Sequence, residues 1–312
     1  MKTRHAFTLV EILTVVAIIG ILATIITVAV AAAMSAAKRA KIAVEMSHIT
    51  MGIERYKAEF DEYPPDLFDD ESLVRHVRKR WPRLEWSNMP SAGSQAESIR
   101  IAINEAYGNN VNFGGIAPLL NSQAGSLAHW LGGFPNSDGT FLGFYADPEN
   151  PFTPSDTFDK KTFANLELGK NVRLENYGNG CIVPVVGTEV QSNFVPFVYF
   201  RGTSSGGHTS YMITDAGHTK YGQIKQFDFS SANLGFCVPY AEDANGGEIK
   251  WKHPSTFQLI HPGLDGNFGE PAPDDPTVAP LRVIKTGENV GALDLDNITN
   301  FSDNKELKSI LP

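Results

Sequence analysis

The sequence predicts an α+β protein in which a long N-terminal helix packs on a C-terminal antiparallel sheet, with a large insertion between the two. Three observations predict this fold class. An uncharged apolar run covers residues 12–37, an amphipathic pattern follows as far as Phe60, and short β-branched and aromatic segments begin near residue 180. With 42% hydrophobic and 20% charged residues, the 312-residue chain can bury a core, which excludes an intrinsically disordered protein.

The apolar run predicts a membrane helix. Residues 12–37 carry no charge, and as a helix they would be about 39 Å long, which exceeds the ~30 Å hydrocarbon core of a bilayer. A buried core helix of this length without a polar face is rare. On these residues alone, the run could be a removable signal peptide, with small-residue sites at 29–31 and 31–33, or a permanent anchor.

Glu11 is the feature that neither interpretation explains. It is the carboxylate at the start of an otherwise uncharged helix, and an ionisable group in a membrane helix costs about 2.5–3.5 kcal/mol at the centre and less near the interface. Such a residue is by default a functional candidate. The alternative is a first-turn carboxylate that complements the helix dipole.

The run Ala6–Glu11 (AFTLVE), followed by the apolar segment, closely resembles the processing signal of type IV pilins and type II secretion pseudopilins. In that family a prepilin peptidase cuts before the Phe and methylates the new amine. The resemblance therefore implies cleavage between Ala6 and Phe7, an N-methylated Phe7, and assembly through Phe7 and Glu11. The family prefers Gly where this chain has Ala6, and it often has a helix-kinking proline in the region of Val28.

The implied role of Glu11 has a physical basis. Packed apolar helices in a filament leave no water to solvate a charge, so Glu11 of one subunit would neutralise the Phe7 amine of its neighbour. A buried charge is costly when unpaired and tolerable when paired and hydrogen-bonded. The pair would thus fix the axial register of the subunits.

The resemblance implies four parts: a leader peptide (1–6), a transmembrane and filament-core helix (7–37), an amphipathic helix continuing into the head (38–60), and a globular head (61–312). It implies a non-enzymatic filament subunit, inserted in the bacterial inner membrane with its head outside the cytoplasm and then carried in a periplasmic or cell-surface filament. The expected partners are the prepilin peptidase, other pilin or pseudopilin subunits, the inner membrane, and an assembly platform and motor.

Two questions stay open at this level. The motif does not separate a pilus from a pseudopilus, although the large head hints at a minor or specialised subunit. The rival from another class is a secreted or membrane-anchored binding or enzymatic domain with an ordinary signal peptide or anchor.

The helical pattern continues beyond the apolar run. Its apolar residues recur at spacings of four and three, which places them on one face of a helix: Ile42, Met46, Ile49, Ile53, Tyr56 and Phe60. The sequence Tyr63-Pro64-Pro65-Asp66 ends the helix, because proline cannot continue it. We therefore expect one helix from Phe7 to Phe60 whose second half is covered by the head.

A basic run lies in the predicted insertion. Residues 71–86 contain five cations and two tryptophans, a composition that could contact DNA: Arg75, Arg78, Lys79, Arg80, Arg83, Trp81 and Trp86. The formal net charge of the whole chain is −9, which argues against a general nucleic-acid binder. We expect a solvated helix face and no nucleic-acid partner.

The C-terminal part predicts short strands at residues 194–200, 210–214, 256–261 and 280–285. The loop after the third of these resembles the glycine–aspartate loop of pseudopilin heads, a region that binds calcium. The resemblance implies calcium ligands at Asp265, Asn267 and Glu270, with Asp243, Asn245 and Glu248 as additional candidates, all of them hard oxygen donors. The alternative is an Asp-Gly turn with solvated side chains.

Two remaining residue types bear on chemistry. Cys181 and Cys237 could form a disulfide outside the cytoplasm, or remain two buried thiols. The eight histidines show no HExxH spacing. The sequence therefore predicts no catalytic site.

Overall fold

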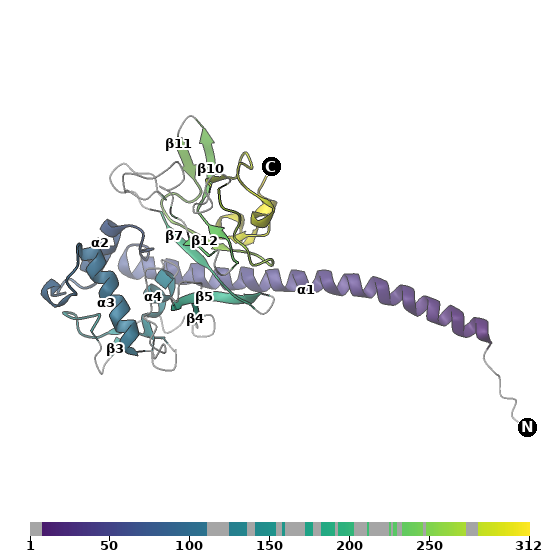
Figure 1. Cartoon of the computed structure of the whole chain (residues 1–312), viewed down its shortest axis with the longest axis horizontal. Helices are drawn as coiled ribbons and strands as arrows, with labels where there is room; N and C mark the ends of the chain where they lie inside the picture. Colours follow the sequence, from purple (N-terminus) through teal and green to yellow (C-terminus); the bar gives the residue numbers. More distant parts are fainter. Residues whose placement is uncertain are drawn as a thin grey trace, which may run out of the picture. The chain divides into compact units, whose positions relative to one another are not determined.

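The computed structural model describes residues 8–110, 125–135, 141–153, 158–159, 172–176, 182–190, 193–202, 211, 225, 227–229, 233–245, 248–272 and 280–312. The chain divides into two compact units, Met1–Lys41 and Ile42–Pro312. The first helix, α1 (Leu9–Phe60), contributes its apolar half to the first unit and its amphipathic half to the second (Figure 1).

The second unit continues with helices and short strands. The helices are α2 (Asp70–Arg80), η1 (Trp86–Asn88), α3 (Gln95–Asn110), α4 (Ser126–Gly132), η5 (Ala292–Asp294), η6 (Asn300–Ser302) and η7 (Leu307–Ser309). The strands are β1 (Phe134–Pro135), β2 (Phe141–Tyr145), β3 (Phe158–Asp159), β4 (Val172–Asn176), β5 (Ile182–Val190), β6 (Asn193–Pro196), β7 (Val198–Arg201), β8 (Phe227–Asp228), β9 (Phe236–Cys237), β10 (Tyr240–Asn245), β11 (Glu248–Trp251), β12 (Phe257–His261), β13 (Arg282–Val283), β14 (Ile298–Thr299) and β15 (Lys305–Glu306).

The amphipathic half of α1 buries the stripe that the sequence predicts. Its core residues are each at most 2% exposed: Ile42, Met46, Ile49, Ile53 and Tyr56. They belong to one hydrophobic cluster with residues of α2, α3, α4 and the central sheet. Since each fully buried aliphatic side chain contributes about 1.5–3 kcal/mol, this stripe is a major apolar contact between the helix and the head.

The end of α1 is set by a left-handed residue and two prolines. The backbone N–H of Asp61 donates to the carbonyl of Lys57 at 2.7 Å, and Asp61 has φ 58°. This arrangement satisfies a helix-end carbonyl and turns the chain away, and Pro64 then prevents further helix. The predicted end at Phe60 is confirmed.

The central sheet has the order β15-β14-β12-β7 and is antiparallel throughout. Its register pairs Leu259 with Tyr199 and Ile260 with Val198. Because side chains alternate between the faces of a strand, Leu259 and Tyr199 join the cluster around α1, whereas Ile260 and Val198 join a second cluster. The sheet is thus buried on both faces, and the α+β class with a C-terminal antiparallel sheet is confirmed.

One predicted strand is shorter and paired differently. The segment 280–285 yields only β13, and β13 pairs with β10 in parallel, through Tyr240–Arg282 and Ala241–Val283. A turn follows at once, in which the N–H of Gly287 donates to the carbonyl of Ile284. Strand 256–261 is confirmed as β12, and the predicted strand 210–214 lies outside the described residues except for Tyr211.

Candidate functional site

The first turn of α1 is closed by a capping box of Thr8 and Glu11. The Glu11 carboxylate oxygen Oε2 accepts from the backbone N–H of Thr8 at 2.7 Å and from its hydroxyl at 2.8 Å. In return, the Thr8 hydroxyl oxygen accepts from the backbone N–H of Glu11 at 3.2 Å. These bonds satisfy two of the free donors at the helix N-terminus and fix the start of α1 at Leu9, two residues after the predicted start at Phe7.

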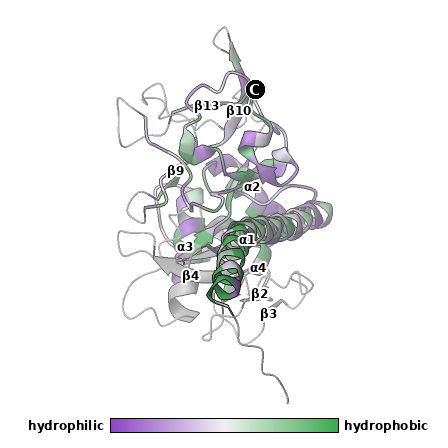
Figure 2. Cartoon of the chain, turned by 90° about the vertical axis from the view of Figure 1, so that its right-hand side faces the viewer, coloured by the Kyte–Doolittle hydropathy of each residue, from purple (hydrophilic) through white to green (hydrophobic). Residues whose placement is uncertain are grey.

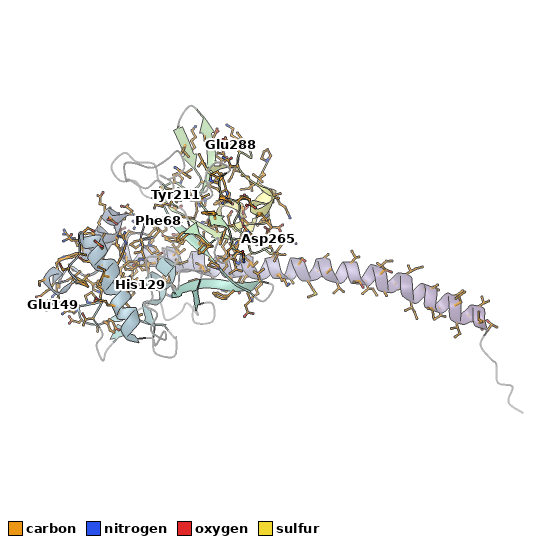
Figure 3. All side chains as sticks on the ribbon, in the orientation of Figure 1. Phe68, His129, Glu149, Tyr211, Asp265 and Glu288 are labelled. Atoms are coloured by element: carbon orange, nitrogen blue, oxygen red, sulfur yellow. The ribbon has the colours of Figure 1, made fainter. Side chains whose placement is uncertain are left out.

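The apolar half of α1 is exposed on all sides. Its large side chains point outward around the helix (Figure 3), and the ribbon of this half is coloured mostly as hydrophobic (Figure 2). Within the described part of the chain, α1 is the helix that is long and apolar enough to cross a membrane. A surface of this kind is stable only in lipid or against other apolar helices.

The first 27 residues match the family model of the prokaryotic N-terminal methylation motif. The chain begins with a type IV pilin-type prepilin segment. Searches of curated proteins and of solved structures found no match to the chain. The matched range contains Ala6, Phe7 and Glu11, so the motif predicted from the sequence is confirmed as a prepilin-type segment.

The prepilin segment implies two partners. One is a prepilin peptidase, which processes such segments, and the other is a set of further pilin subunits with which the processed chain assembles. The apolar helix is consistent with membrane anchoring. The cleavage site itself, Ala6–Phe7, lies outside the described residues, and the roles of Phe7 and Glu11 remain predictions.

The predicted calcium loop is a turn that is closed by its own hydrogen bonds. Asp265 Oδ1 accepts from the backbone N–H of Asn267 at 2.8 Å, and Asn267 Oδ1 accepts from the N–H of Gly269 at 2.9 Å. Glu270 is exposed at the end of the turn. The structure thus brings Asp265 and Asn267 together, and the described residues contain no cluster of three His, Cys, Asp or Glu side chains around a common point.

Asp296 joins this loop from a remote segment, and no pattern in the sequence indicates that it does. Its Oδ2 accepts from the backbone N–H groups of Leu264 at 2.7 Å and Asp265 at 3.0 Å. Burial, with the neighbouring carboxyl of Asp296 as a lesser cause, raises the pKa of Asp265 to about 6. Two neighbouring carboxyl groups repel each other when both are ionised, and a bound cation would relieve this repulsion.

Calcium binding here remains a prediction with a direct test. If the ion binds at Asp265, adding a chelator to the full-length chain should lower its melting temperature by several degrees, since ligand binding to the folded state is lost. The Asp265→Asn variant should melt at the same temperature with and without calcium. Equal melting temperatures of the unmodified chain in calcium and in chelator would remove this site.

The additional candidates are partly engaged elsewhere. The Asp243 carboxylate pairs with the Lys285 ammonium through Oδ2 and accepts from the N–H of Ala244 at 2.9 Å through Oδ1. Asn245 and Glu248 face each other across the β10–β11 hairpin, and their side chains lie outside the described residues. Asp243 therefore already has a cationic partner, which comes from the segment after β13.

The five cations of the basic run all contact other residues of the head. Arg75 pairs with Glu62 at 3.7 Å, Lys79 with Asp61 at 3.3 Å, and Arg83 with Glu149 at 2.8 Å. Arg78 lies over the Trp86 ring and donates to Gln95, while the Arg80 guanidinium packs on the rings of Phe60, Trp81 and Phe144. These cations cover the head's own carboxylates and rings, which favours the solvated-face interpretation over a DNA-binding patch.

A buried ion cluster that the sequence analysis missed joins the end of α1 to the head. We define it as Glu62, Asp66, His76, Arg201 and Lys225. The Lys225 ammonium donates to Asp66 Oδ2 at 2.7 Å and to the Arg201 carbonyl at 2.8 Å, and Asp66 Oδ2 also accepts from the Arg201 N–H at 2.9 Å. The side chains of Lys225 and Asp66 are only 1% and 2% exposed.

The histidine of the buried ion cluster connects it to α1. His76 Nδ1 lies 2.8 Å from Glu62 Oε1, so this nitrogen carries the proton and donates to the carboxylate. His76 Nε2 then accepts from the Tyr56 hydroxyl at 2.5 Å. The signal for this cluster is the run Asp61–Asp66, which is rich in acids next to two prolines, but its cations come from remote segments and leave no local pattern.

Buried histidines make the head sensitive to acid. Burial lowers the pKa of His129 and of His261 to about 3, so both are neutral in the folded chain, whereas the unfolded chain protonates them below about 6.5. The unfolded state therefore binds more protons between pH 6.5 and 3, and stability falls as the pH falls through this window. Differential scanning calorimetry should show the melting temperature dropping between pH 7 and pH 4.5.

Two further points sharpen this pH prediction. Burial opposes ionisation of Glu62, but the hydrogen bond from His76 and the charge of Arg201 outweigh it and lower the pKa of Glu62 to about 2. The stability that ionised Glu62 adds to the folded head is lost only as the pH falls below about 4.5. The His129→Phe variant keeps a ring in the pocket and should show a smaller drop; a drop equal to that of the unmodified chain would contradict this origin.

The predicted disulfide stays a prediction. Cys237 is buried in the second hydrophobic cluster, with 1% of its surface exposed. Cys181 lies outside the described residues.

Proposed function

We propose that this chain is a structural subunit of a type IV pilus-like or type II secretion-type filament, assembled through α1 after prepilin peptidase processing. The observation that carries the proposal is the prepilin segment together with a helix whose apolar half is exposed on every side. A membrane anchor alone would need the apolar surface but not the prepilin-type segment at its start.

The assembly step exchanges lipid contacts for helix–helix contacts. Within the packed helices, Glu11 of one subunit pairs with the methylated amine of Phe7 of the next. Glu11 Oε2 is used by Thr8, so Oε1 is the carboxylate oxygen with capacity for the neighbouring amine. Before assembly, the subunit is held in the inner membrane with its head outside the cytoplasm, and an assembly platform and motor drive its extraction.

The head acts by binding and not by catalysis. The Glu62–His76–Tyr56 chain has the form of a proton relay, but Tyr56 has no exposed surface and so cannot reach a substrate. The other histidines on which the structure gives burial are His129 and His261, both fully buried, and the exposed His48 and His253. This pattern supports a structural head that determines what the filament touches.

Filament formation tests the proposal in cells that hold the complete assembly machinery. The tagged chain should appear in the fraction sheared from the cells or in cross-linked ladders, and only when the prepilin peptidase is present. An uncleaved chain that stays in the membrane fraction under both conditions would support the anchored domain instead, and a chain released as a soluble monomer would support an ordinary signal peptide.

A further inference from the structure

The head contains a pocket of about 290 Å³ that is lined by three segments of the second unit. The segments are α3, the residues around η1, and the loop after β2, on which Figure 3 labels Glu149. The floor of the pocket is apolar and consists of residues that are each at most 8% exposed: Leu84, Ala102, Ala106 and Phe152. Ala102 and Ala106 lie one turn apart on α3, and their small side chains leave the space open. We call this space the α3 pocket.

The amides at the rim of the α3 pocket are oriented by carboxylates. Asn88 Nδ2 donates to Glu85 Oε2 at 3.1 Å and to Asn150 Oδ1 at 2.9 Å. Asn150 Nδ2 in turn donates to Asp147 Oδ2 at 3.1 Å. Because an ionised carboxylate accepts hydrogen bonds and donates none, these contacts decide which end of each amide carries the N–H groups. The oxygen of the Asn88 side chain is therefore left as an acceptor at the rim.

The rim of the α3 pocket also carries the carboxylate of Glu105, which is exposed. Within the described part of the chain, neither this carboxylate nor the Asn88 side-chain oxygen takes part in a hydrogen bond or an ion pair. α3 has no lysine or arginine three or four positions from Glu105. Arg100 of α3 and Arg83 beside η1 are each paired with another carboxylate of the head. A ligand that matches this rim must therefore supply both hydrogen-bond donors and positive charge.

We propose that the α3 pocket binds an ammonium group on an aliphatic stem, which is the chemistry of a lysine side chain and of a free alkylamine. The ammonium donates to the Glu105 carboxylate and to the Asn88 oxygen, and charge-assisted hydrogen bonds of this kind are stronger than neutral ones. The stem covers the apolar floor and removes it from water. Residues 61–312 contain 31 acidic and 19 basic residues, a formal net charge of −12, so the head as a whole also attracts a cation.

Two other classes of ligand fit the α3 pocket less well. A metal ion would leave the apolar floor uncovered, and the described residues contain no cluster of three His, Cys, Asp or Glu side chains that could hold one. An anion would meet the Glu105 carboxylate and find the side-chain N–H groups of Asn88 already used. The pocket is formed within one chain, so its occupation does not depend on the proposed filament.

Methyl NMR of the full-length chain in detergent micelles tests the binding. Of the six methionines in the chain, Met89 lines the α3 pocket and Met51 is exposed on α1, so methyl-labelled methionine provides a reporter and an internal control. A blocked tripeptide with a central lysine and free pentylamine should each shift the Met89 resonance saturably and leave the Met51 resonance in place. The same tripeptide with norleucine, which has the stem without the ammonium, should bind at least tenfold more weakly.

The two amines distinguish the sources of the ligand. Tighter binding of the lysine tripeptide assigns the pocket to lysine side chains of a partner protein, and tighter binding of pentylamine assigns it to free amines. A Met89 resonance that moves with neither amine, or that moves equally with the lysine and the norleucine tripeptide, overturns the proposal. Either of these last results leaves the proposed function standing.

A pair of charge variants gives a matched comparison. Glu105→Gln keeps the size of the side chain and should raise the Kd of the lysine tripeptide at least fivefold. Glu288→Gln makes the same change in charge at another exposed residue of the head and should alter this Kd less than twofold. An unchanged resonance of the fully buried Met46 shows that the head of each variant is folded. Equal Kd values for the two variants would contradict binding of the ammonium at Glu105.

Discussion

Replacing Glu11 by Gln should abolish filament formation and leave cleavage and membrane insertion intact. The variant separates the two roles of this side chain. Glutamine at the third helical position still accepts the Thr8 N–H and completes a capping box, so the start of α1 is retained. The negative charge is lost, however, and the amine of the neighbouring Phe7 would then be buried without a counterion, which costs several kcal/mol at every subunit contact.

The expected yield of sheared filaments is at least a hundredfold below that of the unmodified chain. Glu11→Ala, which removes both the charge and the cap, should be no better. The matched control is Thr8→Ala, which removes the hydroxyl from the capping box and should weaken the helix start by about 1 kcal/mol while retaining the charge. Normal filaments from Glu11→Gln together with failure of Thr8→Ala would show that the cap, and not the charge, is what assembly requires.

Replacing Lys225 by a neutral side chain should destabilise the head more than the same replacement at an exposed lysine. Lys225→Met leaves the Asp66 carboxylate buried without its cation, and breaking a buried ion pair in this way typically costs about 3–5 kcal/mol. The loss should appear as a lower midpoint in urea denaturation of the detergent-solubilised chain, followed by tryptophan fluorescence.

Two comparisons make the Lys225 prediction specific. Lys285→Met removes an ammonium that is 59% exposed from its pair with Asp243, so it should lower the urea midpoint far less than Lys225→Met does. The double variant Asp66→Asn/Lys225→Met removes both charges and should recover part of the loss, because no uncompensated charge remains. If the double variant loses more unfolding free energy than the two single variants lose together, the ion pair is not the origin of the effect.

The parts of the fold that the sequence predicts depend on local periodicity. The uncharged run predicts the length of the apolar half of α1, and the stripe from Ile42 to Phe60 predicts the buried face of its second half. The structure confirms the end of this helix. The capping box is also local, since Thr8 and Glu11 are three residues apart. The buried faces of β12 and β7 follow from short β-branched and aromatic segments.

The remaining features depend on contacts between remote segments. Asp66 and Lys225 are 159 residues apart, and nothing in either segment indicates that they meet. Asp296 joins the loop of Asp265 from 31 residues away. The parallel pairing of β13 with β10 likewise depends on how the chain returns to the sheet, and a pattern of apolar residues gives no information on strand direction.

The central claim is that the N-terminal segment is processed so that α1 can assemble with other subunits. The most direct measurement is the mass of the mature N-terminal peptide from chain purified from cells containing the prepilin peptidase. The account predicts a chain that begins with Phe7 and carries one methyl group on its amine. A start near Ala32 or Met34, which would remove most of the apolar half of the helix, or an intact Met1 would contradict it.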